Sequence, residues 1–295
     1  MKKLIVILLA LSLVLPAFSA TAQEGDEGYG LYVGGMEVTP DNENDLFGDG
    51  TASYNPESKT LALKGALITG GAGVPDGSGD YMLVSVYAKN NLKINVSDTC
   101  TIACLSSERA NAGWYGIRCE GKLTIRGSSA DSSTLKVVVY GTDGKLQISS
   151  ACGIWCGDSL EVNSVYVESG CMDAAEGFEE SRQCGIFCKG MLKPTDAIVV
   201  GYTADQSLGS GTAGVDIHTL EFDRAAIVGI SGNNGLAFNG MLTPDEYQNM
   251  AYVGLFSSVE SGNNYDGSGT KADQLANFTN SGYSRKYVVI KPQSN

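Results

Sequence analysis

One short phrase recurs along this chain at nearly regular intervals, and it constrains the fold more than any other feature. The phrase is glycine, an aliphatic residue, a variable residue and cysteine, and a leucine follows it a few positions later. Its clearest copies begin at Gly116, Gly153 and Gly185, and weaker copies surround Val86 and Val215. The leucines that follow the five copies are Leu92, Leu123, Leu160, Leu192 and Leu220, which are 31, 37, 32 and 28 residues apart. Periods of this size are typical of solenoids, in which each repeat supplies one stacked unit.

The segments around these leucines have the composition of short strands and tight turns. Valine, isoleucine, threonine and tyrosine recur in them, and 38 of the 295 residues are glycine. No segment of helical length separates the apolar runs, so the pattern favours β structure. We therefore predict an all-β chain that folds as a right-handed parallel β-helix, which is a solenoid. A pair of β-sandwiches is the alternative, and stacking of Ile117, Ile154 and Ile186 in one interior column would exclude it.

The N-terminus has the layout of a secretory signal peptide. Two lysines precede an apolar run over residues 4–15, and the small residues Ala20 and Ala22 follow. The run is too short for a membrane span, and no later stretch approaches about 18 consecutive apolar residues. We predict that residues 1–22 are removed and that the mature chain has no transmembrane segment. Its expected location is secreted, periplasmic or cell-surface associated.

Two hairpin signals precede the repeats. A Gly-Gly pair at positions 34–35 separates two β-prone segments, and a turn-rich stretch over residues 55–59 separates two others. We predict that residues 23–80 form an N-terminal β-hairpin cap, because the open end of a solenoid is an unpaired sheet edge. Residues 81–295 are then the parallel β-helix with a C-terminal closing segment, in which residues 286–290 form a closing strand.

The charge of the chain excludes one class of partner. It carries 20 Lys and Arg against 33 Asp and Glu, a formal net charge of −13. A nucleic-acid-binding surface needs clustered basic side chains that neutralise phosphates. We therefore predict no nucleic-acid partner. The same acidity disfavours a strongly anionic polymer such as pectate, unless calcium bridges the two.

Alternation along a strand divides the repeated phrase into inward and outward positions. The aliphatic residue of the phrase is taken as inward, and the cysteine two positions later shares its side. The interior column predicted in this way contains Cys119, Cys156 and Cys188. Cys152 and Cys184, in register after Tyr115, are predicted to form a second interior column. We expect buried thiols that pack as small hydrophobes, and a disulfide between rungs about 4.8 Å apart is the alternative.

The outward positions of the phrase carry mostly aromatic side chains. By register they form one column on successive coils, which contains Tyr87, Arg118, Trp155, Phe187 and, at its end, Asp216. Aromatic rings suit the apolar faces of sugars, while arginine and aspartate bind hydroxyl or carboxylate groups. We predict that this column is an exposed ligand-binding surface for polysaccharide or a surface glycan. A loop packed over these residues is the alternative.

Residues suited to catalysis or metal binding are few. The single histidine, His218, would have to serve any Ser-His-Asp or Cys-His centre, and we assign no catalytic residues. Cysteines four positions apart, such as Cys100 and Cys104, lie about 13 Å apart on a strand, so one such pair cannot chelate zinc. We predict no cofactor and no metal site. Calcium in an acidic loop is an alternative, although turn chemistry accounts for the same residues, which are Asp41, Glu43, Asp45 and Asp49.

Several segments resemble a group of exported bacterial proteins that are labelled carbohydrate-binding-domain-containing. The segments are residues 31–35, residues 48–54 with residues 60–63, and the recurring Gly-Ile phrases. The resemblance extends over about residues 30–290. Similar proteins form right-handed β-helices of the pectin-lyase-like type. The resemblance implies this fold and a non-catalytic exported protein that binds polysaccharide or a surface glycan.

Two other functions remain open for such a fold. One is a polysaccharide lyase or glycoside hydrolase of the β-helix type, and the other is a structural cell-surface module. Polygalacturonases with a β-helix carry Asn-Thr-Asp, Asp-Asp, Gly-His-Gly and Arg-Ile-Lys strings, and none of these occurs in this chain. An outward aromatic column without these catalytic strings favours a binding protein over an enzyme.

Overall fold

The structure is a computed structural model. It describes residues 28–75, 80–106, 113–141, 150–172, 182–203, 213–221, 223–231, 236–242, 252–256 and 287–291. The predicted signal peptide, residues 1–22, lies outside these ranges. Within them no helix is long and apolar enough to cross a membrane.

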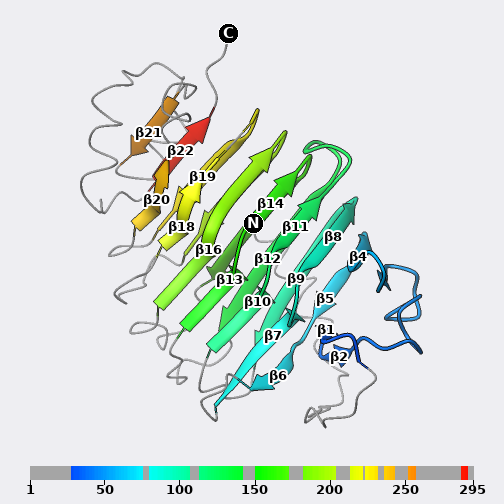
Figure 1. The fold of residues 1–295 in the computed structure, drawn as a ribbon. Helices are drawn as coiled ribbons and strands as arrows, with labels where there is room; N and C mark the ends of the chain where they lie inside the picture. The colour runs from blue at the N-terminus through cyan, green and yellow to red at the C-terminus, as the bar shows by residue number, and fades with distance from the viewer. Residues whose placement is uncertain are drawn as a thin grey trace, which may run out of the picture.

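The described chain is all-β and coils into a solenoid of about four turns, as Figure 1 shows. Three stacked faces of short strands form the coils. The first face contains β7 (Tyr81–Ala88), β10 (Gly113–Cys119), β13 (Ser150–Cys156), β16 (Arg182–Thr195), β18 (Ala213–Leu220) and β20 (Leu236–Leu242). The second contains β4 (Thr60–Lys64), β8 (Leu92–Ser97), β11 (Leu123–Arg126), β14 (Leu160–Asn163) and the C-terminal half of β16. The third contains β5 (Leu67–Thr69), β9 (Thr99–Ser106), β12 (Thr134–Gly141), β15 (Tyr166–Met172), β17 (Ile198–Tyr202) and β19 (Ala226–Ile230).

The register of the coils follows the repeat in the sequence. The marker leucines pair directly on the second face in the order Leu92, Leu123, Leu160, Leu192 and Leu220. Ile117 pairs with Ile154, and Ile154 with Ile186, in parallel register, and all three side chains are fully buried. This interior column confirms the predicted parallel β-helix and excludes the β-sandwich alternative. Consecutive coils therefore bury one continuous apolar core.

A column of glycines brings the first face against the third. A Cβ atom on Gly116 would lie 2.3 Å from Cγ1 of Val137, and one on Gly153 would lie 2.2 Å from Oγ of Ser169. A Cβ atom on Gly185 would lie 2.3 Å from the backbone nitrogen of Tyr202. No side chain fits at such separations, so the repeat requires glycine here. The contact separates the main core from a small inner cluster of Cys104, Trp114, Val139, Ala151 and Cys171.

At the glycine column the strand departs from regular alternation. The residue directly before each glycine therefore lies outside the main core, although alternation would place it inside. Ile154 belongs to the main core, but Cys152 belongs to a different cluster, to which the outward side chains of the phrase are packed. We call it the outer cluster; it contains Ala72, Val74, Met82, Val84, Tyr115, Cys152, Cys184 and Ala213. The prediction that Cys152 and Cys184 form an interior column with the isoleucines is therefore wrong. The column exists, because Cys152 pairs with Cys184, but the chain changes sides at Gly153.

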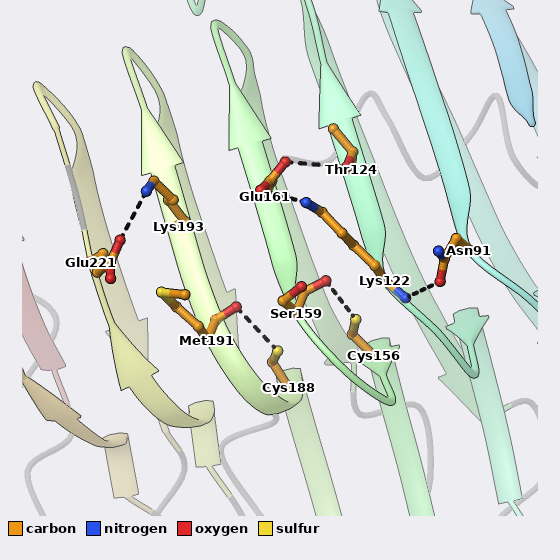
Figure 2. Close-up of polar contacts among 10 residues, drawn as sticks. All are labelled: Asn91, Lys122, Thr124, Cys156, Ser159, Glu161, Cys188, Met191, Lys193 and Glu221. Carbon is orange, nitrogen blue, oxygen red and sulfur yellow. Dashed lines mark hydrogen bonds and ion pairs between the residues drawn. The ribbon is translucent and has the colours of Figure 1, made fainter. Parts of the chain in front are cut away.

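The other cysteine column lies in the main core, where the sequence placed it. Cys119, Cys156 and Cys188 are in register and buried. The Cys156 thiol donates a hydrogen bond to the Ser159 carbonyl at 3.2 Å, and the Cys188 thiol to that of Met191 at 3.6 Å (Figure 2). These weak bonds satisfy carbonyls of the turn between the first and second faces. All eight cysteines of the chain are described, and all are buried free thiols.

Antiparallel strands cover the N-terminal end of the coils. The hairpin of β1 (Leu31–Val33) and β2 (Met36–Glu37) turns through Gly34 and Gly35, whose φ angles of 61° and 89° suit glycine. Both β1 and β6 (Ala72–Pro75) run antiparallel to β7 along its outer edge. The hairpin of β3 (Ala52–Asn55) and β4 covers the second face in the same way. Hairpins therefore lie at the N-terminal end of the coils, but β4 and β5 also run parallel to β8 and β9 and so begin the first coil. The cap over residues 23–80 stays a prediction.

The C-terminal end is closed by an antiparallel pair. β22 (Tyr287–Lys291) runs antiparallel to β19 on the third face, and β21 (Tyr252–Phe256) runs antiparallel to β22. The strand predicted over residues 286–290 is therefore present. Antiparallel pairing at both ends protects the edges of the parallel faces.

Candidate functional site

The predicted outward residues form one continuous column on the first face. We call it the outer ladder; it contains Tyr87, Arg118, Trp155, Phe187 and Asp216, which pair in that order on β7, β10, β13, β16 and β18. Asn239 of β20 extends it by one rung, and Tyr32 of β1 lies opposite Tyr87. The structure therefore brings together all five residues that the sequence predicted.

Trp155 is the centre of the outer ladder. Its ring stacks with that of Phe187 on the next rung, with centroids 6.0 Å apart and planes inclined by 20°. The guanidinium of Arg118, on the preceding rung, lies 4.1 Å from the Trp155 centroid, and the Lys189 ammonium lies 5.0 Å from it. Because its neighbours lie on the rungs before and after it, Trp155 has both ring faces covered. The edge of the ring is therefore the part that is left uncovered.

Other members of the outer ladder are also engaged with neighbours. Arg118 forms an ion pair of 2.6 Å with Glu120, and Asp216 accepts a hydrogen bond of 2.8 Å from the Asn239 amide. The rings of Tyr87 and Tyr32 lie 6.3 Å apart. Burial raises the pKa of the Tyr87 hydroxyl. The charge of Arg118 is thus partly neutralised by Glu120, and the Asp216 carboxylate is already hydrogen-bonded.

The outer ladder is partly buried, whereas the sequence predicted an exposed column. Tyr87, Trp155 and Phe187 pack against the outer cluster, and none of the five predicted side chains is fully exposed. The reason is the change of side at the glycine column. It places Tyr115 and the cysteines at 152 and 184 next to the aromatic rings, where an alternating strand would have placed them in the core.

A small hollow lies beside the aromatic rings of the outer ladder. It has a volume of about 120 Å³ and is lined by Tyr115, Ser150, Ala151, Cys152, Trp155, Cys184 and Phe187. The Tyr115 hydroxyl and the Ser150 hydroxyl form a hydrogen bond of 2.9 Å at its side, and burial raises the pKa of Tyr115. Its apolar walls and its two hydroxyl groups suit a small polar substituent of a larger molecule.

Sequence reasoning missed Tyr115, Ser150 and Cys152 as members of this surface. Tyr115 and Cys152 directly precede a glycine of the repeat and were assigned to the interior by regular alternation, while Ser150 was not considered. The glycine at the same position of three repeats was the signal that could have shown a kink there.

The second face carries ion pairs between rungs instead of aromatic side chains. Lys122 binds Glu161 at 2.6 Å, and Lys193 binds Glu221 at 2.9 Å, as Figure 2 shows. Thr124 donates a longer hydrogen bond to Glu161, at 3.5 Å. Exposed pairs of this kind contribute about 0–1 kcal/mol each to stability. Because these charges are matched within the sheet, the second face is a weaker candidate for ligand binding.

The acidic loop considered for calcium uses its carboxylates in turns. Asp45 accepts hydrogen bonds from the backbone of Gly48 at 2.9 Å and of Gly50 at 3.1 Å. Asp49 accepts two from Thr51, which lower the pKa of its carboxyl group. Across the described ranges, no group of three or more His, Cys, Asp and Glu side chains could hold a metal ion. His218 lies exposed on β18.

The comparisons with known proteins add no relative. No protein-family model, no curated protein and no solved structure matches this chain. The class of the protein is therefore defined by its own fold, an all-β parallel solenoid of about four turns with hairpins at its N-terminal end.

Proposed function

We propose that this chain is a non-catalytic, exported binding protein that holds a polysaccharide or a surface glycan against the outer ladder. The observation that carries the proposal is the row of Arg118, Trp155 and Phe187 on three successive rungs, with a hollow beside it. Export rests on the predicted signal peptide. The resemblance of several sequence segments to carbohydrate-binding-domain-containing proteins agrees with the proposal.

The chemistry of the hollow suits a sugar substituent. Its lining combines the rings of Trp155 and Phe187 with Tyr115 and Ser150, whose hydroxyl groups are hydrogen-bonded to each other. Sites for small polar ligands combine apolar walls with a few placed polar groups in this way. Since both faces of Trp155 are covered, the sugar would contact ring edges and insert a hydroxymethyl or acetamido group into the hollow.

The charges favour a polysaccharide without acidic groups. Arg118 is paired with Glu120, and Asp216 accepts from Asn239. Recognition of a carboxylate would have to compete with the Glu120 pair, and the chain is acidic overall with a formal net charge of −13. Packing and hydrogen bonds to hydroxyl groups would then carry the affinity.

A glycan array tests the proposal directly. We expect the folded chain to bind a subset of neutral glycans and Trp155→Ala to lose that binding. A lyase assay that follows ultraviolet absorbance, with pectate and calcium, tests the enzymatic alternative. Turnover in that assay, or an array with no bound glycan, would contradict the proposed function.

A further inference from the structure

The hollow contains two thiols on neighbouring rungs, and we propose that Cys152 and Cys184 form a two-coordinate site for a soft monovalent metal ion such as Cu(I). The two residues pair directly in register, and both line the hollow. Each is 3% exposed, so each side chain borders the hollow without standing in solvent. This inference is independent of glycan binding.

The two sulfur atoms are held at a separation that suits a linear ion. The Cys152 thiol donates to the Ile154 carbonyl at 3.0 Å, and the Cys184 thiol donates to the Ile186 carbonyl at 3.1 Å. The same contact on both rungs requires the same side-chain rotamer, so the sulfurs are separated by the rung spacing of about 4.8 Å. Two collinear metal–thiolate bonds of the length known for zinc, about 2.3 Å each, would span about 4.6 Å.

A disulfide fits the same pair less well. Its sulfurs must lie about 2.05 Å apart and its Cβ atoms about 3.8 Å apart. The rung spacing of about 4.8 Å is within the Cα–Cα range of disulfides, but parallel side chains keep the Cβ atoms at about the same spacing, so the Cβ atoms would have to move closer. An ion between the sulfurs requires no such movement.

The ligand set selects the kind of ion. Thiolates prefer soft ions such as Cu(I), whereas structural zinc sites use four ligands. The described residues contain no group of three or more metal-ligating His, Cys, Asp or Glu side chains, so a two-coordinate ion is the one that fits. On binding, each thiol loses its proton to solvent, two sulfur–metal bonds form, and the ion keeps its oxidation state.

The environment of the pair is consistent with such a site. Both thiols are buried and lie in the apolar outer cluster. The bound complex of two thiolates and one monovalent cation has a net charge of −1. The Arg118 guanidinium, which also pairs with Glu120, is the cation beside the hollow: it lies over the rings of Tyr115, at 4.9 Å, and Trp155, which both line the hollow.

The chain supplies a matched control pair. Cys156 and Cys188 also pair directly on β13 and β16, but they belong to the main core. Their thiols donate to the turn carbonyls of Ser159 and Met191. They have the same rung spacing and no place in the lining of the hollow.

Competition with a chromophoric Cu(I) chelator under anaerobic, reducing conditions tests the site on the full chain. We expect the wild-type protein to retain one equivalent of Cu(I). Cys152→Ser and Cys184→Ser should each lower the apparent affinity at least tenfold, whereas Cys156→Ser and Cys188→Ser should keep it. Circular dichroism checks that each variant is folded. A wild-type protein that retains no Cu(I), or a folded Cys152→Ser variant that retains it unchanged, would overturn the proposal.

X-ray absorption of the copper-loaded wild-type protein gives a test that needs no variant. We expect two sulfur neighbours in a linear arrangement and no nitrogen neighbour. Three or more neighbours, or any nitrogen ligand, would contradict the two-thiol site even if the serine variants fail to fold.

Discussion

Gly153 and Ser169 lie in the same coil at a distance that leaves no room for a side chain on the glycine. A Cβ atom at Gly153 would be 2.2 Å from Oγ of Ser169, and that hydroxyl donates a hydrogen bond of 2.7 Å to the Gly185 carbonyl of the next coil. One serine thus fixes the approach of the first and third faces within a coil and the stacking between two coils. The contact also explains why the chain changes sides between Cys152 and Ile154.

Gly153→Ala should therefore destabilise the fold. The added methyl group must displace Ser169 or the backbone of two coils, and overpacking of this kind costs about 1–3 kcal/mol. Gly73→Ala is the matched control, because a Cβ atom at Gly73 in β6 meets nothing within 4 Å. We expect that variant to change stability by about 0.5 kcal/mol or less. Urea denaturation measures both, and equal stability of the two variants would show that the glycine column is not required.

The repeat period and the register could be predicted from the sequence, because identical inward residues must stack to bury one core. The marker leucines and the isoleucines at 117, 154 and 186 show this directly. The position of Cys152 could not be predicted by alternation, since alternation assumes a regular strand. The kink at Gly153 depends on Ser169, a contact that only the folded coil creates. The register of the outer ladder could also be predicted from the sequence. Its partial burial could not, because that burial follows from the same kink.

Stability should fall at alkaline pH, because ionisation of the buried Cys104 thiol is unfavourable in the folded chain. Burial raises the pKa of Cys104 from 9.0 to about 12. The unfolded chain therefore loses this proton first, so the stabilising contribution is complete below about pH 9 and is lost as pH rises towards 12. Denaturation under reducing conditions should show a flat free energy of unfolding up to about pH 8 and a decline above about pH 9.

Cys104→Ala is the control for this pH dependence. It should be less stable at neutral pH because it leaves a small cavity beside Trp114 in the inner cluster. Its stability should nevertheless decline less steeply between pH 9 and 11 than that of the wild-type protein. Parallel profiles for the two proteins would show that the Cys104 thiol does not contribute to the alkaline loss.

The second face should not contribute to ligand binding. Glu161→Gln removes the ion pair with Lys122, and the expected loss of stability is about 1 kcal/mol or less because the pair is partly exposed. Glycan binding should remain within about twofold of the wild-type value, since exposed substitutions away from a contact surface have small effects. Titration calorimetry with a glycan taken from the array measures this, and a large loss of affinity would place the binding surface on the second face.

Trp155 and Ile154 are adjacent in β13 but lie on opposite sides of it, and substituting each separates binding from folding. Trp155→Ala should weaken glycan binding by about 1–3 kcal/mol, because a central tryptophan often carries much of the energy of a binding surface. It should also cost about 1–2 kcal/mol of stability, because the contacts with Phe187 and Arg118 are lost. Ile154→Ala should cost about 2–5 kcal/mol of stability, since its side chain is fully buried in the main core.

The affinity of the folded Ile154→Ala protein is the decisive comparison. An inward substitution leaves the outer ladder in place, so we expect its folded fraction to bind glycan as the wild-type protein does. Calorimetry below the unfolding temperature measures that affinity, and circular dichroism gives the folded fraction. If Trp155→Ala binds as tightly as the wild-type protein, or if Ile154→Ala loses affinity while folded, the outer ladder is not the binding surface.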